Sequence, residues 1–195
     1  MTSVSALENI HTKGLFGDYE NKNETDLLKI SESKNLLIVQ IVQYKNSSIS
    51  IDDFDIDNLK LKNEPLNVIS NNDTRILWSG PKNWFLVSTK KNLLKNILQV
   101  FKDTDFAVTD LSHSRAIIEL EGQNVKEVLK KGCPYNFNLL DKNNSINSTY
   151  NGIAFTVDMI DDNPLKIRLF SLRSFGESLY YSISDSSLEF GYKAI

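Results

Sequence analysis

The first clear apolar run begins at residue 36, and from residue 76 onward apolar and polar residues follow a regular order. Apolar runs at 36–42 and 84–88 predict buried strands. After the second run, apolar residues recur at a spacing of three and four, which predicts an amphipathic helix ending near residue 103. The residues with this spacing are Leu93, Leu94, Ile97, Leu98 and Phe101.

Two more strands are expected directly after this helix, at 106–109 and 115–120. The connection from 84–88 to 106–109 is long enough for a parallel crossover. A short polar corner at 111–114 separates the later two strands, and its length suits an antiparallel return from one to the other.

The second half of the chain carries start and stop signals for helices. A helix is predicted to begin after Gly122 and to stop at Gly132, the expected left-handed position, with Pro134 preventing its continuation. Ser174 and Glu177 are three residues apart and predict a capping box for a last helix.

Between these two helices the sequence predicts a hairpin. Its strands are residues 152–158 and 166–171, and its turn lies at 161–164. The resulting order of strand, helix, strand, strand, helix and strand is typical of a ferredoxin-like split unit. The expected fold class is therefore α+β.

Length and the distribution of apolar residues suggest the domain organisation. A chain of 195 residues, 41% of them hydrophobic and 24% charged, predicts one globular domain of one or two lobes, spanning 31–195. Residues 1–30 hold few apolar residues, so we expect an N-terminal arm that, when ordered, lies on the body of the protein or on a partner. The polar and acidic residues 46–63 are expected to form a connection or an edge.

Charge and cysteine content narrow the class of protein. A net charge of −3 and a pI near 5.5 provide no basic field for nucleic acid. A single cysteine excludes an internal disulfide framework. Neither a signal-peptide pattern nor a span of about 18 apolar residues occurs, so the sequence predicts a cytoplasmic protein that binds neither membrane nor nucleic acid.

Asp110, Ser112 and His113 are the residue types of a catalytic triad. Triad residues meet through tertiary folding, however, and adjacent side chains of an extended segment point to opposite sides. We therefore expect a hydrogen-bonded polar corner. Cys133 follows a helix C-terminus, where the dipole opposes a thiolate, so a buried and unreactive thiol is expected.

Candidate metal ligands are few. His11, His113 and Cys133 are too scattered for a zinc site. The spacing of an EF-hand calcium loop occurs at Asp53, Asp55, Asp57, Asn58 and Glu64. Because the preceding residues look extended and two lysines lie inside the loop, a solvated acidic loop is favoured, with calcium binding as the alternative.

The sequence shows no phosphate-binding motif. None of its eight glycines has the spacing of a dinucleotide or P-loop motif, so a dinucleotide cofactor is not expected in this chain. Trp78 and Trp84, flanked by Arg75 and Lys82, could stack on a flat ligand. Aromatic residues beside a strand more often belong to the core, and both interpretations stay open.

Several blocks of sequence stand out together: LWSGPKNWFLVS at 77–88, VTDLSHSRAIIELEG at 108–122, VLKKGCP at 128–134 and RSFGESLYYSI at 173–183. In this order and spacing they resemble the gamma subunit of heterotetrameric sarcosine oxidase, which has an aminomethyltransferase-like fold. SALENIHTKGLFGD near the start resembles the N-terminal arm of that family.

The chain departs from the family pattern at two places. After the GCP triplet the family usually has an acidic residue, a leucine and a histidine, whereas this chain continues with YNFN at 135–138. Lys82 and Asn83 replace the usual acidic pair before Trp84. These changes affect ionic contacts that the family makes there and leave the expected fold unchanged.

The resemblance implies a noncatalytic subunit. Enzymes of this family oxidatively demethylate sarcosine to glycine and pass the one-carbon unit to tetrahydrofolate. The resemblance places no cofactor in this chain, and FAD, FMN, NAD and tetrahydrofolate in other subunits. It implies the alpha, beta and delta subunits as partners, mainly alpha. The alternative is a free-standing folate-binding or one-carbon transfer protein of the same fold.

We expect the arm and the polar corner to dock against the alpha subunit. Arg115 is the strongest candidate, because a guanidinium can bind a carboxylate or carbonyl groups across an interface. An internal salt bridge between Arg115 and Asp110 is the alternative. The interface candidates are Asp110, Ser112, His113, Arg115 and Trp84.

Overall fold

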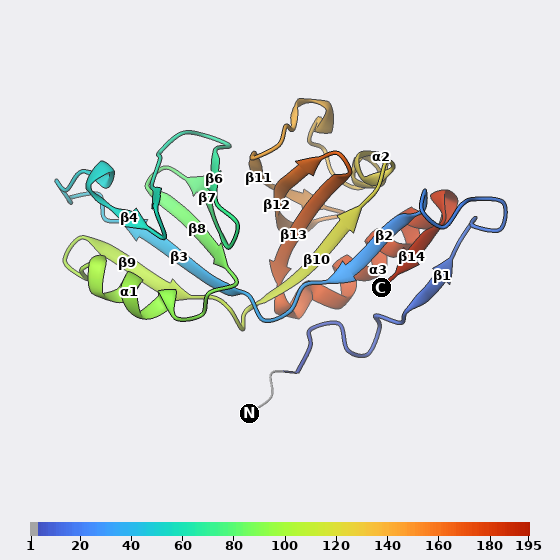
Figure 1. Ribbon diagram of the computed structural model, residues 1–195, viewed down its shortest axis with the longest axis horizontal. Coiled ribbons are helices and arrows are strands. Elements are labelled where there is room, and N and C mark those ends of the chain that lie inside the picture. The colour runs from blue at the N-terminus through green and yellow to red at the C-terminus, as the bar shows by residue number, and fades with distance from the viewer. Residues whose placement is uncertain (1–3) are drawn as a thin grey trace. The chain divides into compact units, whose positions relative to one another are not determined.

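The computed structural model describes residues 4–195 and divides them into two compact units. Unit 2 consists of Asn35–His113 with Asn143–Ser145, and unit 1 contains the rest of the described chain. Unit 2 is thus inserted into the sequence of unit 1 (Figure 1). The sequence predicts a single domain beyond the arm, whereas the structure distributes that range over both units.

Unit 2 contains a five-stranded antiparallel sheet, a two-stranded hairpin and one α-helix. Its elements are β3 (Leu37–Gln43), η1 (Ile51–Asp53), β4 (Asp55–Ile56), β5 (Leu59–Lys60), β6 (Val68–Ser70), β7 (Thr74–Gly80), β8 (Asn83–Ser88), α1 (Leu93–Val100) and β9 (Phe106–Asp110). The strand order is β6-β7-β8-β3-β9, and β4 pairs with β5 (Figure 1).

Alternate residues of β3 build the apolar core of unit 2. Leu37, Val39 and Ile41 are buried there, as alternation along a strand requires. Helix α1 adds Leu93 and Ile97 to this cluster, so the predicted amphipathic helix is confirmed. The crossover is also confirmed, because β8 and β9 both pair antiparallel with β3 and therefore run parallel to each other.

Unit 1 is built on a seven-stranded sheet with the order β1-β14-β2-β10-β13-β12-β11. Its strands are β1 (Gly14–Phe16), β2 (Leu28–Glu32), β10 (Arg115–Glu121), β11 (Ser145–Tyr150), β12 (Ile153–Asp162), β13 (Leu165–Leu172) and β14 (Tyr192–Ala194). Strands β12 and β13 form the predicted hairpin.

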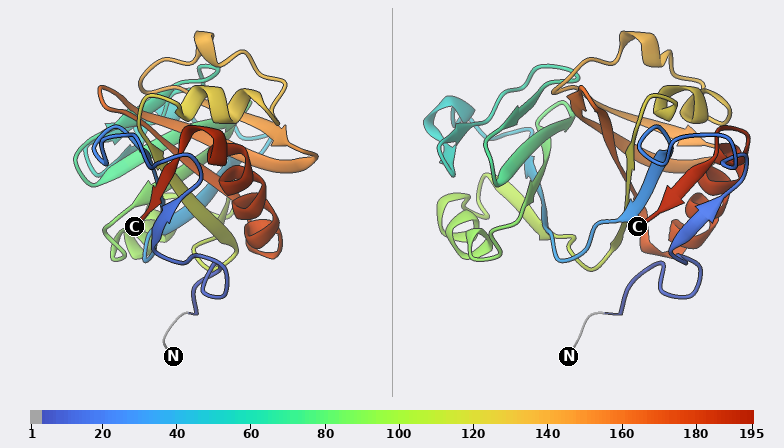
Figure 2. Two further views of the ribbon diagram at one scale, coloured as in Figure 1. Left: turned by 90° about the vertical axis from the view of Figure 1, so that its right-hand side faces the viewer. Right: turned by 45° about the vertical axis from the view of Figure 1, so that its right-hand side comes forward.

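Two α-helices pack on the sheet of unit 1 (Figure 2). They are α2 (Val125–Lys130) and α3 (Gly176–Ser187), and the short 3-10 turns are η2 (Phe137–Leu139), η3 (Arg173–Phe175) and η4 (Leu188–Phe190). Helix α3 contacts β10, β13 and α2, and it buries Leu179 and Ile183. None of the helices found in residues 4–195 has the length and apolarity needed to span a membrane.

The expected antiparallel return through the polar corner is wrong. Strand β9 belongs to the sheet of unit 2, whereas β10 belongs to the sheet of unit 1 and pairs with β2 and β13. The α+β class is confirmed, but the strands of the predicted ferredoxin-like order are divided between two sheets. A local pattern identifies a strand; its sheet partners depend on segments far away in the sequence.

Two predicted helix ends differ from the structure. Gly132 has no positive φ, and glycine is needed there because a Cβ would lie 2.7 Å from the ring of Tyr150. The capping box is wrong as well, because Ser174 lies inside η3 and α3 begins at Gly176 without a side-chain cap. Close tertiary contacts therefore override the local signals at both ends.

Part of the predicted arm is an internal strand. β2 begins at Leu28, which is fully buried, and it lies between β14 and β10. The first three residues of the arm lie outside the described residues. Residues 4–11 lie on unit 1, where Leu7 is fully buried and the Ala6 amide donates to Glu32 at 3.2 Å.

Candidate functional site

The polar corner after β9 is fixed by hydrogen bonds to β3. Asp110 Oδ1 accepts bonds from the amide of Ser112 at 2.9 Å and from its Oγ at 2.5 Å. Ser112 Oγ accepts a hydrogen bond from the Ile38 amide at 3.0 Å, and the Leu111 amide donates one to the Ile38 carbonyl at 2.8 Å. Both roles of the Ser112 hydroxyl are thus occupied, which confirms a structural corner and leaves this hydroxyl unsuited to act as a nucleophile.

The remaining members of the predicted interface differ in position. His113 is exposed at the end of unit 2, and Asp110 beside it is exposed as well. Arg115 belongs to unit 1 as the first residue of β10, and its Nη1 donates to the carbonyl and hydroxyl of Ser114. Burial lowers the pKa of the Arg115 guanidinium.

Trp84 is a core residue, which corrects its place among the interface candidates. Its side chain is 1% exposed, and Nε1 donates to the Lys62 carbonyl at 2.7 Å. The ring belongs to the cluster between the sheet and α1. Trp78 on the paired strand is partly exposed and donates to Asn63 Oδ1 at 3.1 Å. Trp84 therefore offers almost no surface to a partner or a flat ligand.

Cys133 and His11 also form hydrogen bonds within the chain. Cys133 is 6% exposed and its Sγ donates to Ser148 Oγ at 3.3 Å, which confirms a buried thiol. His11 Nε2 donates to the Ile195 carbonyl and Nδ1 accepts from the Tyr180 hydroxyl, each at 2.9 Å. Across residues 4–195, no group of three or more His, Cys, Asp or Glu side chains is arranged to hold a metal ion.

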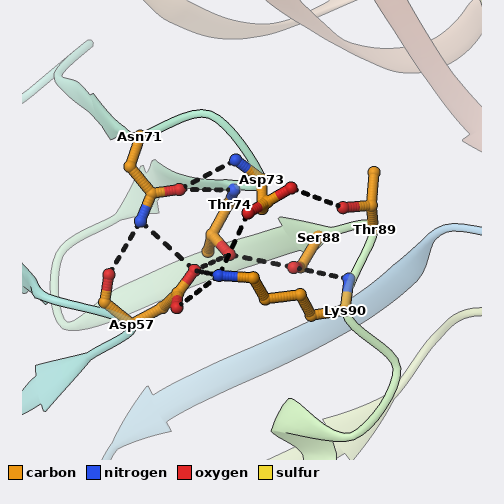
Figure 3. A network of polar contacts seen from close by, with 7 residues as sticks. All are labelled: Asp57, Asn71, Asp73, Thr74, Ser88, Thr89 and Lys90. Carbon is orange, nitrogen blue, oxygen red and sulfur yellow. Dashed lines mark hydrogen bonds and ion pairs between the residues drawn. The ribbon is translucent and has the colours of Figure 1, made fainter.

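The residues with calcium-loop spacing lie in η1, in the β4–β5 hairpin and just after it. Asp57 and Asn58 form the turn between β4 and β5, both with positive φ. Lys90 Nζ lies 2.8 Å from Asp57 Oδ1 and 3.1 Å from Oδ2, and Thr74 Oγ1 donates to Oδ2 at 2.6 Å (Figure 3). Both carboxylate oxygens of Asp57 are thus occupied by donors of this chain.

A network around Asp57 joins the β4–β5 hairpin to β7 and β8. Asn71 Nδ2 donates to the Asp57 carbonyl at 2.7 Å, and Asn71 Oδ1 accepts the amides of Asp73 and Thr74 (Figure 3). Thr74 and Ser88 share a buried hydroxyl contact of 2.9 Å. The hydrogen bond from Lys90 is the main cause that holds the pKa of Asp57 below its ordinary value, and the hydrogen bond from Thr74 adds to it.

Thr74→Val tests the structural role of this network. The variant keeps the β-branched shape but removes the buried hydroxyl that serves Asp57 and Ser88, so we expect a loss of about 1–2 kcal/mol in the free energy of unfolding. Urea denaturation followed by tryptophan fluorescence measures the loss. Thr89→Val is the matched control, because the exposed Thr89 hydroxyl donates only to Asp73 at 3.2 Å. Equal losses in both variants would contradict the assignment.

A second polar cluster lies on the sheet of unit 1 and centres on Glu119 of β10. Glu119 Oε1 accepts from Arg168 Nε at 2.8 Å and from Ser33 Oγ at 2.6 Å, and Lys166 Nζ lies 3.1 Å from Oε2. Burial raises the pKa of Glu119, but the charge of Arg168, the hydrogen bonds and Lys166 outweigh it and hold the pKa at about 2. The carboxylate joins β10 to β13 and to Ser33, the residue directly after β2.

Neither polar cluster was found by sequence reasoning. Asp57 and Lys90 are 33 positions apart, and Glu119 and Arg168 are 49 apart, so no local spacing links them. The only signal for Glu119 was its polar position within a strand that alternates with apolar residues. In both clusters the carboxylate pairs with a cation of the same chain, and this pairing suits a structural scaffold.

The comparisons with known proteins agree with the fold. The family model described as sarcosine oxidase, gamma subunit family matches residues 57–189. A chain of heterotetrameric sarcosine oxidase from Corynebacterium sp. U-96, solved with pyrrole 2-carboxylate, superposes with a TM-score of 0.81 at 19% identity, covering 96% of this chain and 95% of that one. No curated protein matches the sequence.

A wider structural relative is the glycine cleavage system aminomethyltransferase T from Bartonella henselae, with a TM-score of 0.58 at 13% identity. The match covers 83% of this chain but only 46% of that chain. The aminomethyltransferase-like fold is therefore confirmed, and a gamma subunit is favoured over a free-standing folate-binding protein. Because the family model covers more than half of the sequence, the chain belongs to the sarcosine oxidase gamma subunit family.

Proposed function

We propose that this chain is the noncatalytic gamma subunit of a heterotetrameric sarcosine oxidase. In this role it supports oxidative demethylation of sarcosine to glycine and transfer of the one-carbon unit to tetrahydrofolate. Alpha, beta and delta subunits are its partners, in the cytoplasm, and they hold FAD, FMN, NAD and tetrahydrofolate. The match of nearly the whole chain to one chain of such an enzyme carries the proposal.

The engagement of the candidate reactive groups supports a noncatalytic role. The Ser112 hydroxyl is held by Asp110 and Ile38, and the Cys133 thiol is buried against Ser148. Catalysis requires a nucleophile or base that can reach a substrate, and internal pairing removes that freedom. The chain is thus suited to shape and support a neighbouring subunit.

The docking surface we propose on unit 2 consists of Asp110, Ser112 and His113, and Arg115 is a separate candidate on unit 1. Asp110 and His113 are exposed, and the hydrogen bonds of Ser112 give the corner one fixed geometry. A rigid surface binds with a smaller entropy loss than a flexible loop. The arm, residues 4–11, is held on unit 1, and so contributes as an ordered segment to any contact with the alpha subunit.

Co-expression of this chain with its three partner subunits tests the proposal. Native mass spectrometry should detect one assembly that contains this chain together with flavin-bearing subunits. The purified lone chain should show no sarcosine turnover and no bound flavin. A chain that stays apart from the other subunits contradicts the subunit role, whereas turnover by the lone chain contradicts only the noncatalytic part.

His113→Ala tests the polar corner separately from the fold. His113 is exposed, so we expect the free energy of unfolding to change by less than about 0.5 kcal/mol. Loss of its contacts should weaken binding to the other subunits by about fivefold, measured by interferometry. Asn96→Ala, at an exposed position on α1, is the control and should leave binding unchanged. Unchanged binding of His113→Ala would remove this residue from the proposed surface.

A further inference from the structure

We propose that the outer edge of β9 binds an extended, basic segment of another subunit by strand addition. The inference rests on the proposed function, because it requires a partner subunit. Strand β9 is the last strand of the five-stranded sheet, and within residues 4–195 it pairs only with β3. An edge strand presents a row of backbone donors and acceptors that an extended segment can pair with.

The register identifies the backbone groups that point away from β3. The Leu111 amide donates to the Ile38 carbonyl and the Tyr44 amide donates to the Asp105 carbonyl. Alternate residues of an antiparallel pair exchange hydrogen bonds, so Ala107 and Thr109 are the β9 residues bonded to β3. The N–H and C=O groups of Val108 and Asp110 therefore face outward, and no hydrogen bond found within residues 4–195 joins them to another strand.

The sequence of β9 lacks the features that usually protect a sheet edge. Natural edges are blunted by lysine, proline, a bulge or a very short strand. Strand β9 has the sequence FAVTD, pairs with β3 without a register shift, and spans five residues. The opposite edge, β6, has three residues, and its Val68 amide donates to the Asn143 carbonyl. The two edges of this sheet thus differ, and β9 is the one suited to accept a strand.

The charges around β9 indicate the chemistry of the segment. Asp110 ends the strand with an exposed side chain, and Asp103 and Asp105 precede it. Within residues 102–110, Lys102 is the one cation, and β9 itself contains none. An added segment therefore meets carboxylates at both ends of β9, which favours Lys or Arg in that segment. Ser112, which is partly exposed, and His113, which is exposed, follow directly, so the strand and the proposed docking surface are continuous in sequence.

Amide hydrogen exchange of the lone chain and of the assembled complex tests the inference at single residues. Ala107 and Thr109 should be protected in both states, because β3 bonds their amides. The amides of Val108 and Asp110 should exchange rapidly in the lone chain and become at least about tenfold slower in the complex. Unchanged exchange at Val108 and Asp110 in an assembled complex overturns strand addition and leaves the subunit role intact.

Val108→Pro gives a second measurement. Proline removes an outward N–H that no internal bond uses, and an edge strand tolerates it there. We expect binding to a complex of the other three subunits to weaken by about tenfold. Val108→Thr keeps the amide and the branched shape, and it should bind within about twofold of the unmodified chain.

The remaining outcomes separate the two proposals. Equal binding of Val108→Pro and Val108→Thr overturns strand addition. Protection of Val108 and Asp110 that appears in the lone chain with rising concentration identifies a second copy as the occupant and overturns the assignment to another subunit. If the unmodified chain fails to join the other subunits at all, the proposed function is overturned and strand addition with it.

Discussion

Trp84→Ala is expected to lower the free energy of unfolding of unit 2 by about 3–5 kcal/mol. The indole is 1% exposed inside the core cluster, and its removal leaves both a large cavity and an unpaired Lys62 carbonyl. Chemical denaturation followed by circular dichroism measures the loss. Such a loss approaches the total stability of many domains, so the variant is expected to be largely unfolded at 37 °C.

Trp78→Ala is the matched control for this experiment. Trp78 faces Trp84 across the β7–β8 pair, but it is partly exposed, so its loss should be clearly smaller. Trp84→Phe should fall between the two, because it keeps an aromatic ring but loses the donor to Lys62 and part of the buried volume of the indole. A Trp84→Ala variant that keeps its stability but fails to join other subunits would return Trp84 to the interface and contradict the core assignment.

Glu119→Gln should have the second largest effect and lower the free energy of unfolding by about 2–3 kcal/mol. The amide keeps the size of the side chain, but Arg168, which is 15% exposed, loses its charged partner. Glu121→Gln on the same strand is the control. The pair of Glu121 with Lys29 is more exposed and should contribute less than about 1 kcal/mol. Similar losses for both variants would contradict the special role of Glu119.

The stabilisation from Glu119 should also depend on pH. Its pKa in the folded chain is about 2, below the ordinary value of 4.5. A depressed carboxylate pKa means that the contribution is present above about pH 4.5 and is lost as the pH falls towards 2. The difference in unfolding free energy between the unmodified chain and Glu119→Gln, measured from neutral pH to about pH 3, should shrink accordingly. A difference that grows on acidification would contradict this assignment.

Local pattern predicted most elements correctly and some of their partners wrongly. The strand at 36–42, the helix with Leu93 and Ile97, and the 152–171 hairpin all appear, because alternation and helical spacing are properties of neighbouring residues. The strand that begins at the end of the predicted arm was missed, because β2 is short and has only a few apolar residues. It becomes a central strand through pairing with β14 and β10, which lie far away in the sequence.

Candidate sites were harder to predict than elements. The polar corner at 110–114 was identified correctly, since its hydrogen bonds to Asp110 are local. The Asp57 carboxylate was considered as a metal ligand, yet its donors are Thr74 of β7 and Lys90, two residues after β8. Residue type and spacing report which groups are available. Only the tertiary fold decides which of them are already paired.

The position of β2 between β14 and β10 has a consequence for synthesis of the chain. The sheet of unit 1 needs β14, residues 192–194, between β1 and β2, so its strand order is completed only after residue 194 has left the ribosome. All five strands of the unit 2 sheet lie within residues 37–110 and emerge much earlier. During translation, therefore, unit 2 can fold before β14, the parallel neighbour of β2, has been synthesised.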